Sequence, residues 1–417
     1  MSDAPTLHES VVTDPAGVLL CAAFVLRGSQ VLPDAAVLMI DGRIAAVGSA
    51  DSLRKQHPQA AVEDAGDCIL LPGLINAHTH LELTYLTPPP LPAGGFADWL
   101  RMIIQMGQAD DAVIRAAVQA GIEQCIRFGV TTVADITRHV STSRAILHAG
   151  PLMTISFGEV IALAKRRGLL EARIAAALDP SLTSDRLRLG LSPHAPYTVE
   201  LAGYIRCVEA AQQADVPLAT HLGETEEETV FLGEHRGPLR KLWEDLGAWD
   251  SDVPRFQGGP IRCADHVGLL QRRSLLAHVN YCDDEELQIL ANGNASVIYC
   301  PRTHAYFGHR PHRWREMLAA GVNVAIGTDS TASSPDLNLV DDLRLARKIA
   351  PDLPAPEIWS LATTRAATAL NLPDVGQIEK NYRADLIAFP AVGPDPLEQI
   401  LQQKVLPTHT WLAARRA

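Results

Sequence analysis

The feature that most constrains the fold is a regular alternation along the middle of the chain. Short apolar runs rich in β-branched residues alternate there with longer segments whose apolar spacing is helical. Such alternation is typical of repeated βα units and a parallel sheet. Because eight parallel strands close into a barrel, the sequence predicts a (β/α)₈ TIM-type barrel. The eight runs that fit a strand lie at residues 69–75, 131–134, 153–157, 188–192, 218–221, 275–279, 296–300 and 323–328.

The segments between these runs supply the expected helices. Residues 111–128, 199–214, 312–320 and 337–350 have the length and the apolar spacing of helices. The longest interval, residues 226–268, holds one helical pattern followed by an irregular stretch at 254–260. We expect this interval to be a loop insertion near the active face of the barrel.

The two ends of the chain share a pattern of short strands and turns. Residues 37–40 and 43–48 are apolar runs joined by Asp41 and Gly42, which is a strong hairpin signal. Similar short runs return at residues 376–378 and 384–389. We therefore expect one small β-sandwich domain built from both termini. Its parts would be residues 1–71 and 373–417, with the barrel at 72–372.

Charge and cysteine usage narrow the classes of function. The formal net charge is −12, from 48 acidic residues against 36 lysines and arginines, so the chain lacks the positive surface that nucleic-acid binding needs. The apolar run at residues 17–26 is too short to cross a bilayer and no basic leader precedes it, so we expect a cytoplasmic protein without membrane contact. Seven scattered cysteines without a CxxC pair leave nitrogen and oxygen atoms as the expected metal ligands.

Polar residues with metal-binding side chains gather at the carboxyl ends of the predicted strands, where barrel enzymes hold their active sites. An HxH pair such as His78 and His80 arises by chance about once in two chains of this composition, so the pair alone decides nothing. The ordered set is more informative, because three imidazoles and a carboxylate around an open position suit a catalytic divalent ion. The set comprises His78, His80, His194, His221, His278 and Asp329.

The motifs around these residues resemble the amidohydrolase superfamily, in the branch that includes cytosine, guanine and adenosylhomocysteine deaminases and triazine chlorohydrolases. The matching motifs occur in the family's order over roughly 250 residues, and the two terminal β segments match as well. They are LPGLINAHTH at 71–80, SPHAPY at 192–197, HLGE at 221–224, the strand that ends near His278, and GTDS at 327–330.

The resemblance implies a role for each residue of the set. It implies that His78, His80, His221 and Asp329 hold one divalent metal ion, zinc or iron (Zn²⁺ or Fe²⁺). Glu224 would be the proton shuttle, since a bound metal lowers the pKa of its water toward about 7 and a nearby carboxylate can take the proton. His278 would hydrogen-bond the attacking hydroxide, and Asp329 would also pass a proton to the departing ammonia. The structural alternative is a set of buried histidines with a capping aspartate.

The positions of the lysines favour a single metal. Binuclear members of the superfamily bridge two metals with a carboxylated lysine after the fourth strand. The lysines of this chain are at 55, 165, 241, 348, 380 and 404, and none lies near residues 192–194. The acidic residues after Glu224, at 226–228, are expected to be the solvated start of a helix, where negative charge is favourable.

Six further residues are candidates for contact with the substrate. The family pattern favours a substrate contact for His194, and an acid in the segment of Asp98 holds ribose hydroxyls in relatives that act on nucleosides. Asp98 and Trp99 have an equally plausible structural interpretation as a helix start with an aromatic anchor. Arg138 pairs with a substrate carboxylate or faces solvent, and His304 departs from the family, where Ser-Asn is common. The candidates are Glu82, Asp98, Trp99, Arg138, His194 and His304.

The expected function is hydrolytic deamination of a small molecule. Residues 80–84 together with 96–100 most resemble aminodeoxyfutalosine deaminases, which remove the 6-amino group of a modified adenosine on the menaquinone route. Adenosylhomocysteine or methylthioadenosine deaminase is the nearest alternative, followed by guanine or cytosine deaminase and triazine chlorohydrolase. A non-catalytic amidohydrolase-like binding protein is the alternative from another class, and loss of Glu224 or of a metal ligand would favour it. A homodimer is possible by analogy with relatives.

Overall fold

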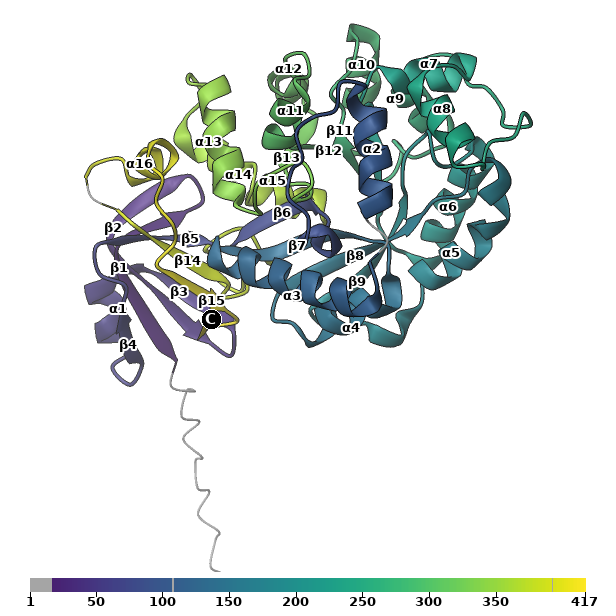
Figure 1. The fold of residues 1–417 in the computed structure, drawn as a ribbon. Coiled ribbons are helices and arrows are strands. Elements are labelled where there is room, and N and C mark those ends of the chain that lie inside the picture. The colour runs from purple at the N-terminus through teal and green to yellow at the C-terminus, as the bar shows by residue number, and fades with distance from the viewer. Residues whose placement is uncertain (1–16, 107–108, 392) are drawn as a thin grey trace, which may run out of the picture.

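The structure is a computed structural model that describes residues 17–106, 109–391 and 393–417. Residues 1–16, in which the sequence analysis found no basic leader, lie outside the described residues. Eight parallel strands in the order β6 to β13 form one of the two sheets, which confirms the predicted barrel (Figure 1). The strands are β6 Leu74–Thr79, β7 Val130–Thr137, β8 Met153–Val160, β9 Leu187–Pro193, β10 Leu218–Leu222, β11 Ser274–His278, β12 Ser296–Tyr299 and β13 Asn323–Ile326.

The first and last barrel strands meet at a single bridge. Thr79 of β6 pairs in parallel with Asp329, just beyond β13, and the backbone N–H of Asp329 donates to the carbonyl of His78 at 3.0 Å. These contacts close the ring of strands and bring two of the predicted metal ligands onto neighbouring backbone segments.

The predicted first strand, residues 69–75, is in fact parts of two strands. Strand β5, Cys68–Pro72, belongs to the terminal sheet, and β6 starts the barrel at Leu74. The chain passes from one sheet to the other at Gly73, where an added Cβ would lie only 2.2 Å from the Thr131 hydroxyl oxygen. The continuous apolar run concealed this break because both strands are fully buried.

The terminal segments form one mixed sheet beside the barrel (Figure 1). Its strands pair along the path β16-β15-β14-β5-β1-β2-β3, and β4 pairs with β1. The predicted hairpin at Asp41 and Gly42 is confirmed, since both residues have positive φ and join β2 to β3. The strands are β1 Val18–Arg27, β2 Gln30–Ile40, β3 Arg43–Ser49, β4 Ala61–Asp64, β14 Leu386–Pro390, β15 His409–Leu412 and β16 Arg415–Arg416.

Helices cover the outside of the barrel, and four of them match the predicted helical segments. These four are α3 Asp111–Arg127, α6 Leu201–Ala214, α12 Trp314–Ala319 and α13 Leu339–Ile349. The long interval after β10 holds three short helices, α7 Glu227–Glu234, α8 Pro238–Asp245 and α9 Gly259–His266, where one helix and a loop were expected. The others are α1 Ala50–Gln56, α2 Gly95–Met106, α4 Val140–Ala149, α5 Leu170–Ala177, α10 Asp284–Asn292, α11 Pro301–Phe307, α14 Ala355–Ser360, α15 Thr364–Ala369 and α16 Pro396–Gln402, with 3-10 turns at Leu81–Leu83, Ala164–Leu169 and Pro180–Leu182.

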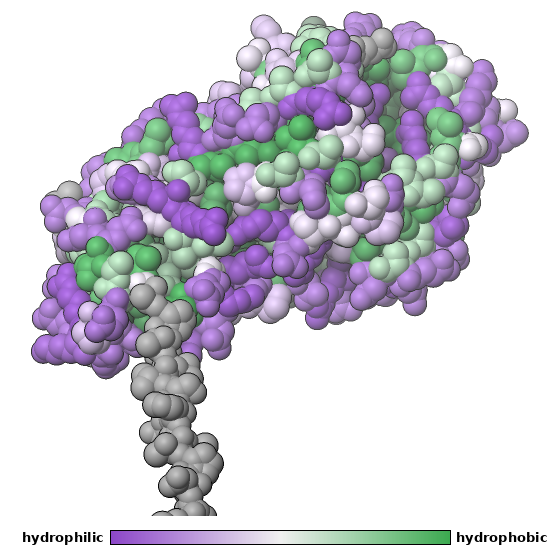
Figure 2. Space-filling model, turned by 90° about the horizontal axis from the view of Figure 1, so that it is seen from below, coloured by the Kyte–Doolittle hydropathy of each residue, from purple (hydrophilic) through white to green (hydrophobic). Residues whose placement is uncertain are grey.

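Apolar side chains fill both sides of the barrel wall. One cluster, which includes Ile75, Ile155 and Leu275 of the barrel strands, continues onto α15. A larger cluster lies between the strands and the surrounding helices. Figure 2 shows that hydrophilic residues border the apolar patches on the face it presents. In the described part of the chain, no helix combines the length and the apolar character that a membrane span needs.

Candidate active site

Five of the predicted site residues meet at the carboxyl ends of four barrel strands. His78 lies on β6, His80 directly follows it, and His221 lies on β10. His278 is the last residue of β11, and Asp329 follows β13. In the described residues, two groups have ligand atoms close enough to share one ion: His78 with His80 and Asp329, and His78 with His221 and His278. The strands thus assemble the set that the sequence had scattered over about 250 positions.

Two backbone features hold this assembly together. Gly327 lies against His78, where an added Cβ would come within 2.7 Å of the His78 carbonyl oxygen, so glycine allows the close approach of the first and last strands. His278, Val279 and Asp329 all have positive φ angles, of 74°, 53° and 58°. Such a conformation is costly for a β-branched residue like Val279, and strained backbone of this kind clusters at functional sites.

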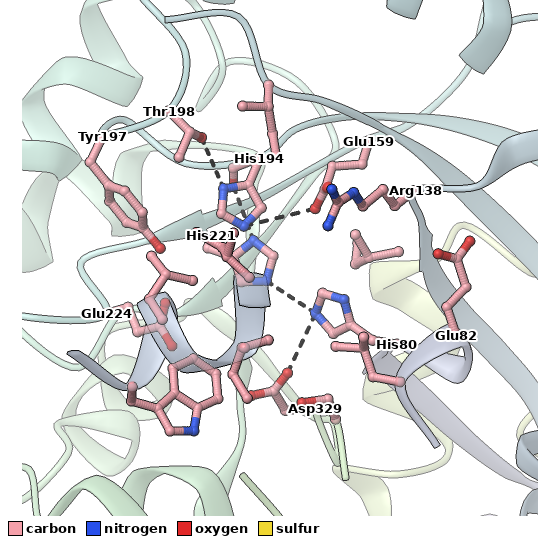
Figure 3. A pocket seen from close by; sticks show the side chains of 18 of the residues that line it. His80, Glu82, Arg138, Glu159, His194, Tyr197, Thr198, His221, Glu224 and Asp329 are labelled. Carbon is pink, nitrogen blue, oxygen red and sulfur yellow. Dashed lines mark hydrogen bonds and ion pairs between the residues drawn. The ribbon is translucent and has the colours of Figure 1, made fainter. Parts of the chain in front are cut away.

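The spacing of the ligand atoms fits a single divalent ion. His80 Nε2 lies 3.2 Å from His221 Nε2 and 3.4 Å from Asp329 Oδ1 (Figure 3). His78 Nε2 lies 3.6 Å from Asp329 Oδ1 and is buried without a hydrogen-bond partner in the part of the chain that the structure describes. Ligands of a tetrahedral ion with metal–nitrogen bonds of about 2.0–2.1 Å lie about 3.3–3.4 Å apart. The distances between these nitrogen and oxygen atoms therefore fit a tetrahedral zinc-type site.

The hydrogen bond of His221 fixes which ring nitrogen is free. His221 Nδ1 lies 3.0 Å from the carbonyl oxygen of His194, and because a carbonyl only accepts, Nδ1 carries the hydrogen. The lone pair of Nε2 is therefore free, and this atom lies 3.2 Å from His80 Nε2. Metal-binding histidines are usually oriented in this way: one ring nitrogen binds the metal, and the other donates a hydrogen bond to a carbonyl or carboxylate oxygen.

Burial keeps the imidazoles of His80 and His221 neutral. Burial and the neighbouring His78 lower the pKa of His80 to about 4, and burial lowers the pKa of His221 well below its usual range. Neutral imidazoles keep the lone pairs that a cation needs. Ser333 Oγ donates to Asp329 Oδ2 at 3.0 Å, which leaves Oδ1 directed at the histidines.

Glu224 and His278 form a second pair beside the ligand set. His278 Nε2 lies 3.5 Å from Glu224 Oε1, and both side chains are at least 95% buried. Burial, the charge of Asp329 and the charge of Glu228 raise the pKa of Glu224 well above its usual range. A carboxyl group with a raised pKa in such a position suits both the uptake and the delivery of a proton.

Glu228 corrects the expectation of a solvated helix start after Glu224. Its side chain is fully buried and accepts backbone hydrogen bonds from Gly223 at 3.1 Å, Glu224 at 2.7 Å and Thr225 at 3.3 Å. Asn280 Nδ2 donates to the Glu224 carbonyl at 3.0 Å. Glu228 therefore organises the loop that carries the proposed proton shuttle. The acidic run hid it, because an acid four positions beyond Glu224 reads equally well as a helix cap.

A cavity opens over these strand ends, and four of the six predicted substrate contacts line it. They are Glu82, Trp99, Arg138 and His194. The Glu82 carboxylate also has hydrogen-bond partners within the protein: the backbone N–H of His139 donates to it at 2.8 Å and Ser143 Oγ at 2.7 Å. Trp99 Nε1 donates to the Ala332 carbonyl at 3.3 Å, so its indole face is held in a fixed orientation.

The structure does not bring the other two candidates to the cavity lining. The side chain of Asp98 is 46% exposed and pairs with Arg101, one turn along α2. His304 is buried on α11, where Nε2 donates to the Arg310 carbonyl at 2.8 Å and the ring packs against Tyr299. These contacts indicate that Asp98 and His304 stabilise the protein's own structure rather than contact the substrate.

The sequence analysis missed two charged residues of the cavity lining, Glu159 and Arg166. Glu159, on β8, lies beside Arg138, and its Oε1 is 3.8 Å from His194 Nε2 (Figure 3). Burial raises the pKa of the Glu159 carboxyl. Its position at the carboxyl end of a predicted strand was a usable signal, but the search for metal ligands favoured histidines.

The comparison with known families is decisive for the class of protein. The family model described as "Amidohydrolase family" matches residues 69–410, which is most of the chain. The chain belongs to the amidohydrolase family. The resemblance expected from the motifs is thereby confirmed, and so is the expectation of a hydrolytic enzyme.

Relatives of this amidohydrolase carry deaminase names. The 5-methylthioadenosine/S-adenosylhomocysteine deaminase of Pyrococcus furiosus is 31% identical over 84% of this chain and 80% of its own length. The aminodeoxyfutalosine deaminase of Deinococcus radiodurans is 30% identical over 76% of this chain and 77% of its own length. The crystal structure of Helicobacter pylori aminofutalosine deaminase with methylthio-coformycin has a TM-score of 0.85 at 25% identity, over 96% of this chain and 99% of that chain.

Proposed function

We propose that this amidohydrolase is a metal-dependent deaminase that removes an exocyclic amino group, as ammonia, from an adenine-type nucleoside. The observation that carries the proposal is the convergence of the ligand set with Glu224 and His278 at the strand ends, where His80, His221, Glu224 and Asp329 line a single cavity. His78, His80, His221 and Asp329 would hold one divalent ion, zinc or iron. Such an ion supplies Lewis acidity that lets a water molecule lose a proton near neutral pH.

The chain's own residues account for the proton movements of this reaction. Glu224 takes the proton of the attacking water and delivers it to the ring nitrogen, for which its buried position and raised pKa suit it. His278 orients the attacking oxygen through Nε2, which is buried and has no other hydrogen-bond partner among the described residues. Asp329 accepts the second proton on the carboxylate and passes it to the departing amino group.

Aminodeoxyfutalosine is the substrate we favour, which would place the enzyme on the menaquinone route. The names of the relatives support an adenine nucleoside with a modified ribose, and they divide between this compound and methylthioadenosine or adenosylhomocysteine. Glu82, Trp99, Arg138 and His194 line the cavity and are proposed as substrate contacts. A cytoplasmic location and a homodimer stay predictions from the sequence.

An assay for ammonia tests the proposal. The purified protein, loaded in turn with zinc, iron and manganese, is offered aminodeoxyfutalosine, methylthioadenosine, adenosylhomocysteine, adenosine, guanine, cytosine and a chlorotriazine. We expect stoichiometric ammonia from at least one adenine nucleoside and the highest kcat/KM for aminodeoxyfutalosine. Release of chloride from the triazine, with no ammonia from any nucleoside, would replace the proposal with the chlorohydrolase alternative.

A further inference from the structure

The cavity has two chemically different sides. The polar side is formed by residues at the strand ends, among them His80, His221, Glu224 and Asp329. Apolar side chains from two helices form the other side of the cavity, which we call the apolar wall. It comprises Phe96, Trp99 and Ile103 of α2 together with Leu242, Trp243 and Leu246 of α8 and its C-terminal cap.

The apolar wall is built as a fixed surface. Trp243 Nε1 donates to the Tyr197 carbonyl at 2.8 Å, and Trp99 Nε1 donates to the Ala332 carbonyl. The rings of Phe96 and Trp99 stack with centroids 5.8 Å apart. Because the indole N–H groups are satisfied within the protein, the wall presents aromatic faces and aliphatic side chains to a ligand rather than hydrogen-bonding groups.

Acidic residues of the cavity lining lie away from the apolar wall, whereas one basic residue lies beside it. None of its six residues is acidic or basic, but one cation of the lining, Arg166, has its guanidinium 5.4 Å from the centre of the Trp243 ring. The acids of the cavity lining, Glu82, Glu159, Glu224 and Asp329, belong to the strand-end side. An anionic group could therefore pair with Arg166, but an ammonium group placed against the wall would be buried without a carboxylate, which is costly.

We propose that the apolar wall binds the 5′ substituent of the nucleoside and selects an apolar or aromatic group over a zwitterionic amino acid. This inference rests on the proposed deaminase function, which places the purine ring at Glu224 and His278. The rest of the nucleoside then extends within the same cavity toward α2 and α8. Methylthio and aryl substituents match the wall, whereas the ammonium of adenosylhomocysteine finds no partner on it.

The test compares kcat/KM for three synthetic adenosines in the zinc-loaded enzyme. They carry a 5′-methylthio, a 5′-phenylthio or a 5′-homocysteinyl group. We expect both apolar compounds to exceed adenosylhomocysteine by at least about 10-fold, the scale of one unmatched group in a binding pocket. Equal or higher kcat/KM for adenosylhomocysteine overturns the inference. Ammonia from none of the adenosines contradicts the proposed function itself, so the two failures are distinguishable.

A substitution in the apolar wall provides a second, independent test. Leu246→Glu places a carboxylate at a half-buried position of the wall, and we expect it to lower kcat/KM for the methylthio compound by about 10-fold or more and to narrow the gap to adenosylhomocysteine. Ile205→Glu is the matched control, because Ile205 is 42% exposed on α6 and does not line the cavity. An unchanged substrate ratio in a folded Leu246→Glu enzyme counts against the wall. The comparison of substrates in the parent enzyme decides the matter if that variant does not fold.

Discussion

The carboxylate of Glu228 accepts a hydrogen bond of 2.7 Å from the backbone N–H of Glu224. The same carboxylate holds the N–H groups of Gly223 and Thr225, and Asn280 holds the Glu224 carbonyl from the other side. Both ends of the Glu224 backbone are thus tied to buried side chains. Burial raises the pKa of Glu228 to about 7, while the three backbone hydrogen bonds favour its ionised form. We infer that Glu228 is a positioning residue for Glu224.

Replacing this carboxylate should slow the reaction without removing the substrate. In Glu228→Gln the amide NH₂ would face backbone N–H donors, so the loop should shift and kcat should fall about 10- to 100-fold, as for other groups that orient a reactive residue. We expect KM to change less than about 3-fold and metal content to be unchanged. Steady-state kinetics with metal analysis measures this. Glu234→Gln, on the exposed end of α7, is the control, and a parent-like kcat in Glu228→Gln contradicts the assigned role.

Removing a metal ligand should remove the metal. His221→Ala deletes the ring whose Nε2 faces His80, and the remaining donors cannot complete a tetrahedral site without it. We expect less than about one tenth of the parent's bound zinc after dialysis, measured by elemental analysis. His266→Ala, at an exposed position that ends α9, should keep the parent's content. Equal zinc in His221→Ala and the parent rejects the ligand assignment.

The contact between His139 and Glu82 gives a prediction about stability and pH. His139 Nδ1 lies 2.7 Å from Glu82 Oε2, and this hydrogen bond raises the pKa of His139 above its ordinary value of 6.5. A histidine whose pKa is raised on folding adds stability below pH 6.5, and this contribution is lost as the pH rises through the folded-state pKa. His139 is about one third exposed, so the contribution should be only about 0.5 kcal/mol.

Urea unfolding of the parent and of His139→Gln at pH 5.5 and pH 8.5 measures this contribution. We expect the free energy of unfolding of the variant to lie below that of the parent by the larger amount at pH 5.5. The two proteins should differ less at pH 8.5, because the contribution of the charged imidazole is lost as the pH rises. A difference that is the same at both pH values, or larger at the higher one, shows that the ion pair does not contribute as described.

The barrel could be predicted from the sequence because its strands are short, apolar and separated by helices, and because His78, His221, His278 and Asp329 mark their carboxyl ends. The break at Gly73 could not, since the buried strands on either side of it form one continuous apolar run. Strand β6 joins the barrel by pairing with β7, and β5 joins the terminal sheet by pairing with β14. Both partners lie far from Gly73 in the sequence.

The substrate side of the site was less predictable than the metal side. Metal ligands are restricted to a few residue types at strand ends, whereas cavity walls use any apolar side chain that a helix presents. Trp243 and Leu246 lie in the interval that was expected to be a loop, and nothing local tied them to α2. Asp98 was assigned by analogy with nucleoside-binding relatives, and its contact with Arg101 depends on how α2 is turned.

The most direct measurement compares ammonia release from an adenine nucleoside by the parent and by Glu224→Gln, with the bound metal of both proteins quantified. We expect one divalent ion per chain in both proteins, stoichiometric ammonia from the parent, and a kcat at least about 10²-fold lower in the variant, because proton transfer is lost while the ligands remain. Parent-like turnover in metal-loaded Glu224→Gln would contradict the assignment of the proton shuttle. Absence of ammonia from the metal-loaded parent with every adenine nucleoside would contradict the deaminase proposal.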